Sequence, residues 1–167
     1  MAYVAICEAK TYYEENHDNA AFIKNIISNN ILPGDIYIKS KELRFDNEVN
    51  RAVLLIRFAN TGEVVHYDVI QNMFPDKSHD YVINIGETDI VLVKEVKSAN
   101  DTKQLEQIAK SIVDTVQAEF YLKVHVGIGS IVSNVKELAR SYKDAQVALE
   151  VGKVFDTEKN VINYENL

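Results

Sequence analysis

The stretch from Leu122 to Gly152 constrains the fold most, because a strand pattern there runs directly into a helix pattern. Over residues 124–128 valine and isoleucine alternate with other residues, which is the period of two of a β-strand. Gly127 and Gly129 then favour a flexible backbone, and the apolar period changes to that of a helix. We therefore expect a strand–helix unit that the rest of the fold must accommodate.

Capping residues mark the start of this predicted helix, and a glycine marks its end. Ser133 and Asn134 can each accept a hydrogen bond from a first-turn amide, and Glu137 follows Asn134 with the spacing of a capping box. Gly152 stands where a left-handed C-cap costs least. The apolar positions between them recur every three or four residues: Val135, Leu138, Ala139, Tyr142, Ala145, Ala148 and Leu149. One face of the helix is expected to lie on a sheet.

The remaining patterns also alternate between strand and helix. Residues 52–58, AVLLIRF, form the apolar run expected of a central strand that is covered on both faces. The other predicted elements are a helix over 64–74, hairpin strands over 81–85 and 89–96, a helix after an N-cap at Asp101 and a last strand over 160–164. This order predicts an α/β (α+β) fold in which helices cover a mostly antiparallel sheet.

A helical lead-in over residues 1–48 precedes this domain, which we place at residues 49–167. Asp35 suits the N-cap of a short helix within the lead-in. The first part of the lead-in either packs back on the sheet or pairs with a second copy. Tyr12 and Tyr13 are adjacent and cannot both face one core, so we interpret one of them as a candidate dimer surface.

The charge balance argues against several classes of partner. The net charge is −7 and the isoelectric point is near 5.1, with 18 basic residues interspersed among 25 acidic ones, which disfavours a nucleic-acid surface. Cys7 is the only cysteine, so an internal disulfide is excluded. Without a signal peptide or a long apolar run, we expect the cytoplasm and no membrane contact. Met1 and Ala2 directly precede a helical pattern and are either a native start or an added start on a piece of a longer protein, of which we favour the second.

The run VGIGSIVSNVKELARSYKDAQVALEVGKVF, followed by VINYENL, resembles the end of the GGDEF-like domain of bacterial transcription regulators of the sugar diacid utilisation and purine catabolism type. A glycine-bearing strand leads there to a helix with a Ser-Tyr-x-x-Ala core, here Ser141, Tyr142 and Ala145. The resemblance extends over about residues 21–167. It implies a cyclase-like scaffold, a homo-oligomer, an effector-sensing region upstream, and DNA binding through a C-terminal helix-turn-helix that is absent from Met1 to Leu167.

The resemblance also indicates where a catalytic site would lie. Active diguanylate cyclases carry Gly-Gly-Asp-Glu-Phe at the hairpin, where glycines admit the nucleotide and acidic residues hold divalent metals. The aligned residues here are Gly86, Glu87, Thr88, Asp89 and Ile90. The other metal aspartate of the family falls at the end of the first strand, where this chain has Arg57, a cation. We therefore expect no enzyme activity, no metal and no cofactor, and we interpret residues 86–89 as a hairpin turn.

The sequence is also compatible with two alternative functions. One is a residual nucleotide-binding or nucleotidyl cyclase domain that uses Asp89 with a non-standard partner. The other is a sensor in which a small-molecule effector occupies a cleft near Arg57 and Asp89, above the first strand. The four histidines lack the short spacings of a metal site, and the pair Gly127 and Gly129 lacks the remainder of a phosphate-loop motif.

Overall fold

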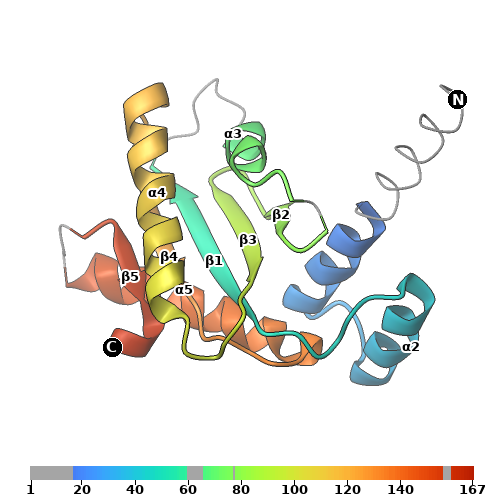
Figure 1. Ribbon diagram of the computed structural model, residues 1–167. Coiled ribbons are helices and arrows are strands. Elements are labelled where there is room, and N and C mark those ends of the chain that lie inside the picture. Colours follow the sequence, from blue (N-terminus) through green and yellow to red (C-terminus); the bar gives the residue numbers. More distant parts are fainter. Residues whose placement is uncertain (1–16, 60–65, 77, 156–158) are drawn as a thin grey trace, which may run out of the picture.

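The computed structural model describes residues 17–59, 66–76, 78–155 and 159–167 (Figure 1). A helix over residues 17–27 comes first in this part of the chain. The elements that follow are α2 (Pro33–Leu43), β1 (Arg51–Phe58), α3 (His66–Met73), β2 (Tyr81–Asn84), β3 (Asp89–Glu95), α4 (Thr102–Phe120), β4 (Val124–Ile128), the 3-10 turn η1 (Val135–Glu137), α5 (Leu138–Val154), β5 (Val161–Asn163) and the 3-10 turn η2 (Tyr164–Asn166).

The five strands form one sheet in the order β2-β3-β1-β4-β5. The pairs β2–β3, β3–β1 and β1–β4 are antiparallel, whereas β4–β5 is parallel. The predicted mixed α/β fold with a mostly antiparallel sheet is confirmed. The central strand is β1, as its apolar run predicted, and every residue in it except Arg57 is buried.

Helices cover both faces of the sheet (Figure 1). The residues of β1 alternate between two cores: Leu54 and Ile56 face the core that includes α3 and α4, and Val53 and Leu55 face the core that includes α5. The second core also contains four side chains of the first helix, which share the sheet face with α5: Phe22, Ile23, Ile26 and Ile27. The described part of the lead-in therefore packs on the sheet, whereas the domain boundary at residue 48 stays a prediction.

The predicted ends of two helices differ from the structure. Asn134 does cap a turn, since its side chain accepts a hydrogen bond from the Lys136 amide at 3.0 Å, but the turn is the 3-10 element η1, and α5 follows. Gly152 is not a C-cap, because α5 continues to Val154 and buries Gly152 against its neighbours. Asp35 is not an N-cap either, since α2 begins at Pro33 and Asp35 lies in its first turn.

The two glycines of the strand–helix unit serve close packing and not flexibility. None of the glycines in the described residues has a positive φ. A Cβ atom on Gly127 would collide with the carbonyl oxygen of Ala145, and one on Gly129 would collide with that of Ser141. Four residues of helix advance about 6.0 Å and two residues of strand about 6.6 Å, so the Ser-x-x-x-Ala spacing of α5 matches the Gly-x-Gly spacing at the end of β4.

Ser141 fixes this contact with its hydroxyl group. Its side chain is fully buried; Oγ accepts a hydrogen bond from the Val53 amide at 3.0 Å and donates one to the Ser130 carbonyl at 2.6 Å. The hydroxyl thereby joins α5, the central strand and the segment after β4. The Ser-Tyr-x-x-Ala motif thus has a packing role in this chain.

Candidate functional site

The hairpin turn between β2 and β3 carries the residues aligned with the cyclase motif. Gly86 and Glu87 are exposed at its tip, and open space surrounds the position that a Gly86 Cβ would take. The amides of Ile85 and Gly86 both donate to the Asp89 carbonyl, at 3.1 and 3.3 Å, and close the turn. Neither the backbone conformation nor the surrounding space therefore requires a glycine at position 86.

Two residues that follow the tip, Thr88 and Ile90, connect the turn to the sheet. The Thr88 carbonyl accepts a hydrogen bond from the Phe58 amide at 2.8 Å, which attaches the turn to the end of β1. Ile90 is buried in the core with α3 and α4. Its side chain is a packing residue.

Arg57 and Asp89, the two residues proposed from the sequence for the cleft, stand directly opposite each other in the β1–β3 ladder. The guanidinium binds the carboxylate through two bonds, Nε to Oδ1 at 3.0 Å and Nη2 to Oδ2 at 3.1 Å. Thr88 Oγ1 donates a third hydrogen bond to Oδ1 at 3.2 Å. The hydrogen bond to Asp89 is the main reason why the pKa of Arg57 is raised above its ordinary value.

A divalent metal does not fit this position. Both oxygens of Asp89 are engaged by a cation, so a metal would have to displace the Arg57 guanidinium and approach its positive charge. Across the described residues, no three His, Cys, Asp or Glu side chains are grouped so that they could share a metal ion. Arg57 and Asp89 at the strand end therefore form an ion pair and not a metal site.

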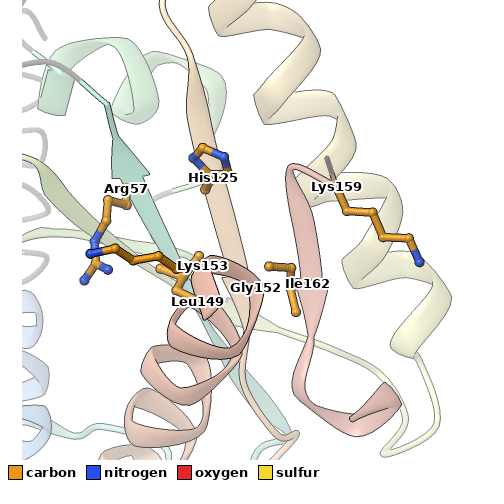
Figure 2. Close-up of a pocket in the computed structure, with 7 residues that line it drawn as sticks. All are labelled: Arg57, His125, Leu149, Gly152, Lys153, Lys159 and Ile162. Carbon is orange, nitrogen blue, oxygen red and sulfur yellow. The ribbon is translucent and has the colours of Figure 1, made fainter. Parts of the chain in front are cut away.

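A pocket of about 240 Å³ lies beside this ion pair, between α5 and the sheet (Figure 2). Its lining residues are Arg57 of β1, His125 of β4, Leu149, Gly152 and Lys153 of α5, Lys159, and Ile162 of β5. Arg57 lines the pocket and Asp89 does not, so the structure brings the two proposed cleft residues together but places only one of them on the cavity.

Sequence analysis missed the other polar residues of this pocket. His125 is directly opposite Arg57 in the β1–β4 ladder, so the two side chains lie on the same face of the sheet. Knowledge of that strand pairing would have identified His125. Lys153 and Lys159 belong to no recognisable pattern in the sequence, and only the packing of α5 against β5 brings them to the same cavity.

The pocket combines positive charge with a neutral imidazole. The pKa of His125 lies below its ordinary value, first because of burial and then because of the charges of Lys123 and Arg57. His125 is therefore uncharged at neutral pH. Glu150 approaches Arg57, with Oε1 3.6 Å from Nη1, but its side chain is 63% exposed.

The candidate dimer surface at Tyr12 and Tyr13 lies outside the described residues. It stays a prediction. Among the helices in the described ranges, none is long and apolar enough to cross a membrane.

In a comparison with known protein families, the family model described as a GGDEF-like domain matches residues 28–151. The match covers well over half of the chain and includes β1, the hairpin and most of α5. No curated protein matches the chain.

Proposed function

The chain belongs to the family of GGDEF-like domains, and from this premise we propose that it is a non-catalytic regulatory domain of a bacterial transcription regulator, in which it supports oligomerisation or relays a signal. The parent protein would be of the sugar diacid utilisation or purine catabolism type. DNA binding would belong to a helix-turn-helix elsewhere in that parent, since this chain has a net charge of −7.

The observation that carries the proposal is the Arg57–Asp89 ion pair. Phosphoryl-transfer sites of the two-metal kind need several oxygen ligands around the metal ions. Here the guanidinium of Arg57 takes the place of the metal aspartate at the strand end, and the hairpin carboxylate, Asp89, binds it through both oxygens. A lone carboxylate that is already neutralised offers little affinity for Mg²⁺, which supports a domain without turnover.

The catalytic part of the proposal is tested by incubating the full chain with GTP or ATP and Mg²⁺ or Mn²⁺. We expect no pyrophosphate release and no cyclic product, whereas an active diguanylate cyclase in the same assay gives both. The matched variant is Asp89→Asn, which keeps the side-chain shape and removes the charge. Turnover in the wild type that this variant abolishes would overturn the proposal and favour a residual nucleotidyl cyclase.

The regulatory part is tested separately. Light scattering at several concentrations should give a mass above that of a single 18.9 kDa chain. A monomer throughout would contradict oligomerisation by this domain. The regulator class is tested in the host, where the full-length gene product should contain a helix-turn-helix segment.

A further inference from the structure

We propose that the pocket between α5 and the sheet binds a small anion, one that presents a carboxylate or phosphate group, as the regulatory ligand of this domain. The regulatory role rests on the proposed function, whereas the binding itself rests only on the geometry of the pocket. The site differs from the sequence-based cleft, because it lies on the side of Arg57 away from the hairpin tip and has α5 and β5 as its other walls.

The first supporting feature is that Arg57 is held in place with part of its guanidinium unused. Asp89 binds Nε and Nη2, which fixes the plane of the guanidinium. Within the described ranges of the chain, Nη1 has only the distant contact of 3.6 Å to Glu150, an exposed side chain on the surface of α5. A ligand oxygen can replace Glu150 there, because that carboxylate can turn into water at little cost. Asp89 is then a positioning residue for the anion site.

The second feature is excess positive charge on the pocket walls. In the part of the chain that the structure describes, neither Lys153 nor Lys159 forms an ion pair. Figure 2 shows Lys153 and Arg57 extending towards the same side of the pocket, whereas Lys159 extends towards the opposite side. Lys153 and Arg57 therefore form the cationic end of the site, where an anion would be attracted by both charges.

The third feature is the size and the apolar floor. The volume of about 240 Å³ gives room for a small organic or inorganic anion. Leu149 and Ile162 supply an apolar wall for a short carbon chain, and the absence of a side chain at Gly152 leaves room between them. The neutral imidazole of His125 adds a hydrogen-bonding group without further charge.

The test is an NMR titration of the full chain with inorganic phosphate and, separately, with succinate, at constant ionic strength kept with sodium chloride. We expect saturable shifts of the backbone amides of His125 and Gly152 with at least one probe. Saturation with phosphate alone identifies a phosphate ligand, with succinate alone a carboxylate ligand, and with both a general small-anion site.

The matched variants are Lys153→Met and Lys143→Met. Each variant removes one positive charge from an exposed position on α5, but of the two residues only Lys153 lines the pocket. We expect Lys153→Met to weaken binding by about tenfold, as for loss of one charge-assisted hydrogen bond, and Lys143→Met to leave it unchanged. Shifts that never saturate with either probe, or an equal loss in both variants, would overturn the inference. That failure would leave the turnover and light-scattering results, and thus the proposed function, unaffected.

Discussion

Replacing Ser141 with alanine removes the hydroxyl that joins α5 to the central strand. In the folded protein this hydroxyl is fully buried and is an acceptor for the Val53 amide at 3.0 Å. The variant leaves this buried amide without that acceptor, because the alanine methyl group cannot replace an oxygen. The Ser130 carbonyl also loses its donor, but Ser130 is only half-buried, so water can substitute there.

The expected loss of stability comes from the buried hydrogen bond between the Val53 amide and Ser141 Oγ. A buried amide that loses its partner costs about 1–3 kcal/mol, and we expect Ser141→Ala to lower the free energy of unfolding by about 2 kcal/mol. A domain of this size has a total stability of roughly 5–15 kcal/mol, so the variant should still fold. Equilibrium unfolding in urea measures the change, provided that the slope against urea concentration is the same as in the wild type.

Ser130→Ala is the matched control for this measurement. The Ser130 hydroxyl also donates a hydrogen bond, to Asp144 Oδ2 at 2.7 Å, and the two serines lie in the same contact between helix and strand. Because this bond is half-exposed, we expect a loss of about 0.5 kcal/mol, within the range of surface substitutions. Equal losses in the two variants, or a Ser141→Ala stability within about 0.5 kcal/mol of the wild type, would refute the reasoning.

Three further predictions concern the same end of the fold. Gly129→Ala should cost about 1–3 kcal/mol in urea unfolding through the clash with α5, whereas Gly86→Ala, where a Cβ meets open space, should cost almost nothing; similar losses would contradict the packing role. A double-mutant cycle of Arg57→Met and Asp89→Asn should give a coupling of about 1 kcal/mol, reduced by the partial exposure of both side chains, and independent effects would mean that the pair is not formed in solution. NMR titration should place the pKa of His125 below its ordinary value of 6.5. The unfolded state then binds the proton more tightly than the folded state, so the free energy of unfolding should fall as the pH drops below 6.5. A pKa above 6.5 would contradict the burial of His125.

Much of the fold was predictable because local sequence patterns indicate its strands and helices. The run AVLLIRF predicted a strand covered on both faces, and β1 is central with one half-exposed residue, Arg57. Gly86 and its neighbours predicted the hairpin, and the structure has β2 and β3 joined there. These predictions needed only the period and turn chemistry of one segment at a time.

The parts that sequence analysis missed depend on packing between distant segments. Gly152 looked like a C-cap because glycine favours helix ends, but it lies inside α5 and opens onto the pocket. The pairing of Arg57 with Asp89 requires β1 and β3 to be neighbours, which the hairpin alone does not specify. The local sequence around Lys153 does not show that this exposed lysine lines a cavity, because the cavity forms only when β5 packs beside α5.

The direct backbone contact of α5 with Gly127 and Gly129 also limits how this domain can move. Two layers separated by side chains can slide as those side chains change rotamer, but here Ala145 and Ser141 rest on strand backbone with nothing between that could repack. We expect α5 and β4 to behave as one rigid body up to about Leu149. Lys153, which lines the pocket, lies one helical turn beyond this point, so the rigid contact between helix and strand ends directly beside the proposed anion site.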